Sequence, residues 1–249
     1  MSPLPRFQLR SRVAPFVVLF IERDGSTYLT SLLASHPDVR VVYERFAVLR
    51  QNGADGAGQL AWAGDYLSPP WIGRAAAIGF KTKLVDILDP AGFAELLRAR
   101  RCRVLMMRRR NHVKAVVSRI NARRLHESTG NWNLYDAADR MPPMIVDPAE
   151  FESFLQERDD AERRLQAYVD SLGLPTLSLV YEDLLLDRDR ALGRLFAFLR
   201  IRPVLLEGRT LKHTPDDLRR VVLNFEDLAD RYAGTAYEPM FHEVIRDGV

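Results

Sequence analysis

The sequence predicts an α/β protein in which a single parallel β-sheet is flanked by helices. Short apolar runs of strand character alternate along the chain with stretches whose apolar residues recur at helical spacing. The apolar runs are unbroken, as expected of strands that are buried on both faces of a parallel sheet. The 249 residues show no repeat and no clear boundary, so we expect one domain over residues 1–249.

The predicted elements follow each other in strand–helix order. Strands are expected over residues 16–21, 39–43, 75–80, 102–107 and 176–181. Helices are expected from Ser26, over residues 90–100, after the capping residue Asn111, and over residues 151–172, 192–199 and 218–228. Two long stretches remain. We interpret residues 51–73 as a helical or irregular excursion and residues 127–148 as a long loop, both on the acceptor side of a site.

The composition excludes several classes of protein. The net charge of +3 is small, and the single cysteine, Cys102, excludes a disulfide framework and a cysteine-based zinc cluster. The five histidines lack metal-ligand spacing, so we expect no metal. No stretch approaches the ~20 apolar residues of a membrane span. The first apolar run is interpreted as a core strand rather than a signal peptide, and we expect a cytoplasmic protein.

The turn after the first strand is a candidate anion site. The charged residues 22–24 end the strand, Gly25 permits a sharp turn, and Ser26 and Thr27 open the next helix. Unpaired N–H groups at a helix start, together with the positive end of the helix dipole, attract phosphate or sulfate. The pattern is neither a G-x-x-x-x-G-K-[ST] loop nor a G-x-G-x-x-G fingerprint. An ordinary turn with a serine cap is the alternative.

Polar residues follow three of the predicted strands. They occupy residues 23–27, 81–83 and 108–111. In parallel sheets ligands bind beyond the carboxyl ends of the strands. Cationic side chains and helix N-termini would therefore meet at one edge of the sheet, as a polyanionic ligand requires.

At this point the motifs resemble those of the PAPS-dependent sulfotransferases, where PAPS is 3′-phosphoadenosine-5′-phosphosulfate. Residues 23–28, Arg-Asp-Gly-Ser-Thr-Tyr, are similar to the 5′-phosphosulfate loop of that family. Arg110-Asn111, with Ser118 farther along, resembles its 3′-phosphate element, and residues 181–184, Tyr-Glu-Asp-Leu, a late-chain pattern. His36-Pro37 followed by Glu44 resembles the bacterial and carbohydrate-acting branch. The resemblance covers residues 16–199 and implies a fold like that of P-loop kinases.

The resemblance implies a sulfotransferase that moves a sulfuryl group from PAPS to a hydroxyl of a carbohydrate or small natural product. The products would be the sulfated acceptor and PAP, adenosine 3′,5′-bisphosphate, with no metal required. Cofactor contacts are implied for Arg23, Asp24, Gly25, Ser26, Thr27, Tyr28, Arg110, Ser118 and Lys212. Glu44 would be the base, and the transferring group would be stabilised by Arg23, Lys81 and Lys83.

Two residues depart from the family pattern. Asp24 stands where a small residue is usual, and its carboxylate would repel a phosphosulfate unless it turned outward or paired with an arginine. Lys83 stands where the animal branch has a catalytic histidine. A protonated lysine is a poor base at neutral pH, so the role of base is assigned to Glu44.

Each assignment has a structural alternative. Arg23 could form a surface ion pair with Glu22 or Asp24, and Glu44 could cap a helix or pair with Arg45. Tyr28 could stack on adenine or pack in the core. Lys81 and Lys83 could simply be surface charges, and Arg109 could belong to a solvated basic face. The three tryptophans could line an acceptor pocket or simply pack in the protein; they are Trp62, Trp71 and Trp132.

Two rival functions remain open. One is a nucleotide or small-molecule kinase of related fold, disfavoured because the Walker lysine is missing. The other is a non-catalytic module that binds RNA or a nucleotide through residues 108–110. Under the sulfotransferase interpretation the partners are a small-molecule or carbohydrate acceptor and no nucleic acid. A homodimer is left open.

Overall fold

The protein is described by a computed structural model that covers residues 13–68, 75–207 and 214–245. Within these residues a five-stranded sheet has the order β2-β3-β1-β4-β5, and every neighbouring pair is parallel. The strands are β1 Ala14–Phe20, β2 Val39–Val42, β3 Ala77–Lys83, β4 Arg103–Arg108 and β5 Thr176–Val180. The predicted fold class is confirmed, and each predicted strand is present.

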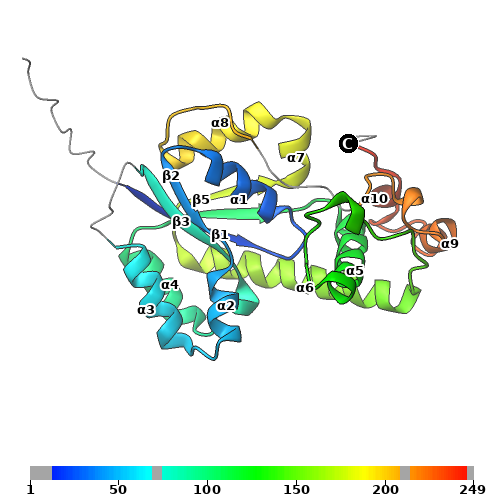
Figure 1. Ribbon diagram of the computed structural model, residues 1–249, viewed down its shortest axis with the longest axis horizontal. Coiled ribbons are helices and arrows are strands. Elements are labelled where there is room, and N and C mark those ends of the chain that lie inside the picture. Colours follow the sequence, from blue (N-terminus) through cyan, green and yellow to red (C-terminus); the bar gives the residue numbers. More distant parts are fainter. Residues whose placement is uncertain (1–12, 69–74, 208–213, 246–249) are drawn as a thin grey trace, which may run out of the picture.

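Helices cover both faces of the sheet (Figure 1). They are α1 Ser26–Ser35, α2 Arg45–Gln51, α3 Gly56–Tyr66, α4 Pro90–Ala99, α5 His112–Thr129, α6 Pro148–Leu172, α7 Tyr181–Leu186, α8 Arg188–Leu199, α9 Phe225–Asp230 and α10 Glu238–His242. The predicted cap of α5 is confirmed, because the Asn111 side chain accepts a 2.8 Å hydrogen bond from the Lys114 N–H. Gly173, in a left-handed conformation, ends α6 as predicted.

The side chains of β1 show why an unbroken apolar run forms the centre of the sheet. Phe16, Val18 and Phe20 belong to the core under α1 and α8. Val17 and Leu19 belong to the opposite core, with α2, α3, α4 and α6. All five are buried, so each face of the strand is covered and neither face tolerates polar residues. This burial fixes the register that brings the ends of β1, β3 and β4 together.

A third core lies at the carboxyl end of the sheet, where the last segment packs on α5 and the start of α6. The predicted helix over residues 218–228 is wrong. A 3₁₀ turn, Leu218–Arg220, is followed by an extended bridge between Val222 and Met144, and only then by α9. The Met144 N–H donates to the Val221 carbonyl at 2.8 Å, so hydrogen bonds to a distant segment replace those of a helix.

The two predicted excursions differ from each other. Residues 51–73 contain the end of α2 and all of α3. Within α3, Trp62 packs on Phe46 and Phe80 in the core. Residues 69–74, which include Trp71, lie outside the described residues. Residues 127–148 contain the last turn of α5, a short 3₁₀ turn at Ala137–Asp139 and the start of α6. In the described part of the chain, no helix has both the length and the apolar character needed to cross a membrane.

Candidate active site

The turn between β1 and α1 has the geometry of an anion site. Gly25 adopts a left-handed φ of 81° at the N-cap position of α1, and no side chain caps this helix. The ring of Tyr181 lies against Gly25, so a Cβ at this position would be 2.8 Å from Cε2 and closer still to Cδ2. Backbone conformation and packing therefore both require glycine. The first N–H groups of α1 are left without a side-chain acceptor, as a bound phosphosulfate would need.

Arg23 and Ser118, predicted from separate motifs, meet in the structure. The Arg23 Nε donates to Ser118 Oγ at 3.0 Å, and Nη1 donates to the Trp132 carbonyl at 3.2 Å. The alternative of a surface ion pair for Arg23 is wrong, because Glu22 pairs with Arg119 at 2.7 Å and Asp24 turns elsewhere. Burial, with the nearby Arg109, lowers the pKa of Arg23 to about 10, so the guanidinium stays charged at neutral pH.

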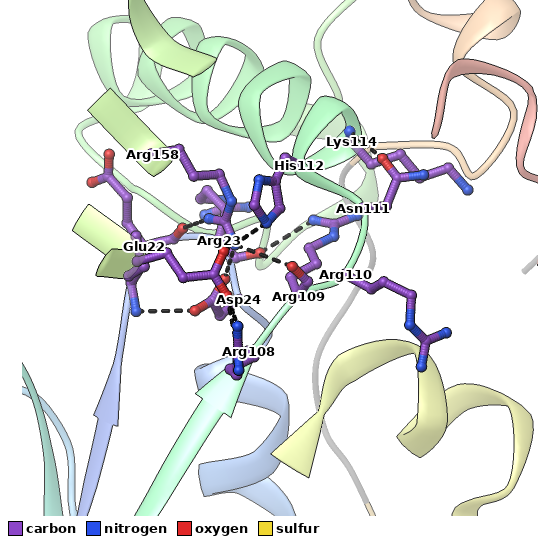
Figure 2. Close-up of polar contacts among 12 residues, drawn as sticks. Glu22, Arg23, Asp24, Arg108, Arg109, Arg110, Asn111, His112, Lys114 and Arg158 are labelled. Carbon is purple, nitrogen blue, oxygen red and sulfur yellow. Dashed lines mark hydrogen bonds and ion pairs between the residues drawn. The ribbon is translucent and has the colours of Figure 1, made fainter. Parts of the chain in front are cut away.

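Asp24 is paired with an arginine, one of the two arrangements that its place in the loop allowed. Its carboxylate forms a buried ion pair with Arg158 of α6 and accepts a 3.0 Å hydrogen bond from the Ile21 N–H. Figure 2 shows Asp24 and Arg158 side by side at the end of β1. Burial raises the pKa of Asp24 to about 6, against the opposing effect of Arg158. Because its carboxylate is engaged within the protein, Asp24 could contact a cofactor only through its backbone.

Lys81 joins the loop to the predicted base. Its Nζ donates to Thr27 Oγ1 at 2.9 Å and Ser26 Oγ at 3.3 Å, and lies 3.0 Å from Glu44 Oε1. The Lys81 side chain is only 1% exposed, so the alternative of surface charge is wrong for this lysine. Burial lowers the pKa of Lys81, whereas the neighbouring Glu44 acts in the opposite direction. One buried ammonium thus contacts both loop hydroxyls and the carboxylate.

Glu44 lies between two lysines. Its other oxygen, Oε2, is 3.7 Å from Lys83 Nζ, which in turn lies 3.4 Å from Asp86. Glu44 occupies the N-cap position of α2 but its side chain makes no capping hydrogen bond, and its ion pairs are with Lys81 and Lys83 rather than Arg45. Both structural alternatives for this carboxylate are therefore wrong.

The consecutive arginines at the end of β4 differ in exposure, which the sequence did not indicate: Arg109 is buried and Arg110 is exposed. Arg110 is 56% exposed and donates to Asp183 at 2.8 Å, so it is within reach of a ligand only if that pair opens. Arg109 is buried, donates to the Arg23 carbonyl at 3.2 Å and lies over the Tyr181 ring. The interpretation of Arg109 as part of a solvated face is wrong. Alternation along β4 gave no signal, because Met106 and Met107 on its two faces are both buried.

The other predicted residues fall in different places. Tyr28 packs, partly buried, against the core under α1, as its structural alternative stated. Trp132 stacks on His126 with ring centroids 4.2 Å apart, and its carbonyl brings the second excursion to Arg23. Lys212 lies outside the described residues. Among the residues that are described, no group of three His, Cys, Asp or Glu side chains could hold a metal ion.

A cavity of about 410 Å³ adjoins this constellation at the carboxyl ends of β1 and β3. Residues that line it include Phe20, Glu22, Lys83, Val116, Phe154 and Leu165. Through Lys83 it reaches the neighbourhood of Glu44. The wall is mainly apolar in area but also carries the charged residues Glu22, Lys83, Arg119, Glu157, Arg158 and Arg164. A concave site of this size is typical of small-molecule binding.

The fold and site bring an uncapped helix N-terminus and the cations Arg23 and Lys81 together at the strand ends of a parallel sheet, an arrangement suited to an anionic ligand. No family model matches the sequence. Nodulation protein H of Rhizobium tropici is 27% identical over 237 residues, covering 91% of this chain and 92% of the relative. Nodulation protein H of Rhizobium meliloti is 26% identical over 239 residues, covering 91% and 94%. The crystal structure of a sulfotransferase from Alicyclobacillus acidocaldarius superposes with a TM-score of 0.50 at 15% identity, covering 94% of this chain and 97% of that one.

The structural neighbour shows the fold, and the two relatives match the chain over nearly its whole length. The resemblance predicted from the motifs is confirmed. The chain is similar to nodulation protein H over nearly its whole length and shares the fold of a sulfotransferase.

Proposed function

We propose that the protein transfers the sulfuryl group of PAPS to a hydroxyl group of a carbohydrate or a small natural product and releases PAP. The observation that carries this proposal is the position of Lys81, whose ammonium contacts the hydroxyls of the phosphosulfate loop on one side and Glu44 on the other. The carbohydrate-type acceptor is supported by the resemblance of the His36-Pro37 and Glu44 pattern to the carbohydrate-acting branch.

The residues present fit a phosphosulfate. The uncapped N-terminus of α1 offers N–H donors, and Arg23 and Lys81 supply two cations on neighbouring strand ends. These groups would hold the anion and stabilise the negative charge that develops on the departing phosphate oxygen. Glu44 would accept the proton of the acceptor hydroxyl as its oxygen bonds to sulfur and the bond from sulfur to the phosphate oxygen breaks.

The two lysines give Glu44 a defined orientation. Lys81 and Lys83 contact different oxygens of the carboxylate, so its side chain is fixed between the loop and the cavity. A base must lie within hydrogen-bond reach of the proton that it removes. An acceptor in the cavity beside Lys83 would present its hydroxyl near this carboxylate. The second excursion, residues 127–148, would cover the same side through Trp132.

The cofactor assignment predicts a strong preference for PAP over adenosine 5′-monophosphate. Arg110 and Ser118 are proposed to bind the 3′-phosphate that the monophosphate lacks, and charge-assisted hydrogen bonds of this kind are worth about 1.5–3 kcal/mol each. Isothermal calorimetry should therefore give at least about tenfold tighter binding for PAP. Arg110→Ala should remove most of the preference, because it removes the guanidinium that is proposed to leave Asp183 and bind the 3′-phosphate.

The control is Arg190→Ala, since Arg190 lies on α8 outside the described site, and it should keep the preference of the wild type. Equal affinity of the wild type for the two nucleotides would refute the assignment. Tighter binding of ATP would favour the kinase, and salt-sensitive binding of long RNA would favour the binding module.

Gly25→Ala is expected to weaken PAP binding at least ~10-fold and to destabilise the fold by more than the ~1 kcal/mol of a left-handed alanine. The added Cβ would clash with the ring of Tyr181, and relief of the clash would move either the loop or α7. Gly173→Ala is the matched control, because Gly173 has a φ of 61° with nothing within 4 Å of an added Cβ. It should show the backbone cost alone, by urea denaturation, with PAP affinity unchanged. If Gly25→Ala and Gly173→Ala showed the same PAP affinity and the same stability in urea, the contact between Gly25 and Tyr181 would contribute to neither.

A further inference from the structure

The phosphosulfate loop contains a strained residue. Arg23 is not glycine, yet its φ is 66°, in the left-handed region. A conformation of this kind is strained in a residue other than glycine and persists only where the surroundings over-determine it. The guanidinium of this strained residue donates to Ser118 in the candidate site. The contacts that hold the Arg23 backbone in its left-handed conformation therefore also affect the geometry of the site.

Two arginines that lie outside the loop, Arg109 and Arg158, contact three consecutive residues at the end of β1. These residues are Glu22, Arg23 and Asp24. Arg158 of α6 donates from Nη1 to the Glu22 carbonyl at 3.3 Å and forms the ion pair with Asp24 through Nη2. Arg109 donates to the Arg23 carbonyl at 3.2 Å, and its own carbonyl lies 3.5 Å from Nη2 of Arg158. These contacts converge on the end of β1 in Figure 2. A guanidinium can reach two acceptors at once because its donors form a planar fork.

Stability alone does not explain the pair of Arg158 and Asp24. Their side chains are only 5% and 1% exposed, and the desolvation of such a pair commonly cancels its attraction. Burial raises the pKa of Asp24 to about 6 even with Arg158 beside it, so the ionised carboxylate is held at a cost. Buried ion pairs of this kind can serve to specify one conformation. The loop has a single glycine, so Arg23 adopts its left-handed conformation without the freedom of glycine.

We propose that Arg158 is a positioning residue for this site: through Asp24 and the Glu22 carbonyl it holds the loop in the conformation that places the Arg23 guanidinium beside Ser118. In this role it acts on the cofactor site only through the loop, although its side chain also lines the cavity beside Lys83. The inference rests on the proposed function, because it assumes that Arg23 acts on the bound phosphosulfate. It explains why an aspartate stands at a position where a carboxylate would otherwise repel the ligand.

The test measures PAP affinity by calorimetry and thermal stability by scanning calorimetry in two variants. Arg158→Lys keeps the charge beside Asp24 but loses the fork that also reaches Glu22. The double variant Asp24→Asn with Arg158→Met removes both charges, so that neither is left buried alone. Each should bind PAP about tenfold more weakly than the wild type, since Arg23 is no longer held, and that loss corresponds to about 1.4 kcal/mol. The double variant should unfold at or above the wild-type temperature.

The decisive control repeats both changes in an Arg23→Ala background. A positioning role that acts through Arg23 predicts that the further loss of PAP affinity is then less than about twofold, a strong non-additivity. Arg163→Lys, at an exposed position on the same helix, should leave affinity unchanged. An equal loss with and without Arg23, or unchanged affinity in Arg158→Lys, would overturn the proposal while the proposed function stands. A wild type that fails to bind PAP would overturn both. If the double variant fails to fold, Arg158→Lys decides alone.

Discussion

Glu44→Gln is expected to lower turnover by about 10²–10⁴-fold, the usual contribution of a general base, while PAP affinity changes little. Glutamine keeps the shape of the side chain, and its single carbonyl oxygen can accept a hydrogen bond from one of the two lysines, but it cannot take a proton from the acceptor. The measurement is sulfuryl transfer from labelled PAPS to an acceptor found by screening sugars and glycosides, together with calorimetry of PAP binding.

The neighbouring Arg45→Gln serves as control for Glu44→Gln, because Arg45 is exposed on the next position of the chain and should leave turnover unchanged. Near-normal turnover of Glu44→Gln would move the role of base to a deprotonated Lys83 or to a group on the acceptor. A loss of PAP affinity equal to the loss of turnover would instead make Glu44 a binding residue.

Lys81→Met is expected to lower turnover by about 10²–10³-fold, the measured cost of removing one preorganised donor from a charge-stabilising site. The variant would also free Glu44 from one of its two lysines and leave the hydroxyls of Ser26 and Thr27 without their shared donor. Because Glu44 is 35% exposed and keeps its pair with Lys83, its carboxylate is not left buried alone, and the thermal midpoint should stay close to that of the wild type. The fall in turnover could then not be attributed to unfolding.

Lys83→Met provides the comparison for Lys81→Met. Lys83 is 24% exposed and does not contact the loop hydroxyls, so its replacement should cost less than the replacement of Lys81. The two variants are assayed with the same acceptor and with saturating PAPS. Equal losses would mean that the lysines act only by orienting Glu44. Full activity of Lys81→Met would remove Lys81 from the site.

The fold and the loop could be predicted because their signals are local. The unbroken apolar run of β1, the Asn111 cap and the Gly25 turn each depend on neighbouring residues, and the structure contains all three. The meeting of Lys81 with the loop was also predictable, because parallel strands end at a common edge. Local pattern failed over residues 218–228, where hydrogen bonds to Met144 outweigh helical spacing.

The supporting arginines could not be predicted. Arg158 lies 134 residues from Asp24 on a helix whose surface carries many charged residues, and nothing in the sequence distinguishes it from them. Arg109 stands in a run of three arginines, and strand parity does not separate it from its exposed neighbour Arg110, because β4 is buried on both faces. The contacts of Arg158 and Arg109 depend on tertiary structure and cannot be recognised in the sequence. The loop residues that they contact belong to a local motif that can be recognised.

The contact between Gly25 and the ring of Tyr181 also restricts the substitutions that this chain can accumulate over evolution. A larger residue at position 25 meets two separate obstacles, the left-handed backbone and the aromatic ring. Loss of the ring alone would remove one obstacle and keep the other, so no single substitution opens a route away from glycine. Tyr181 begins α7 directly after β5, and a change there would also disturb the cation–π partner of Arg109. Descendants of this chain should therefore keep glycine at position 25 even where position 181 varies.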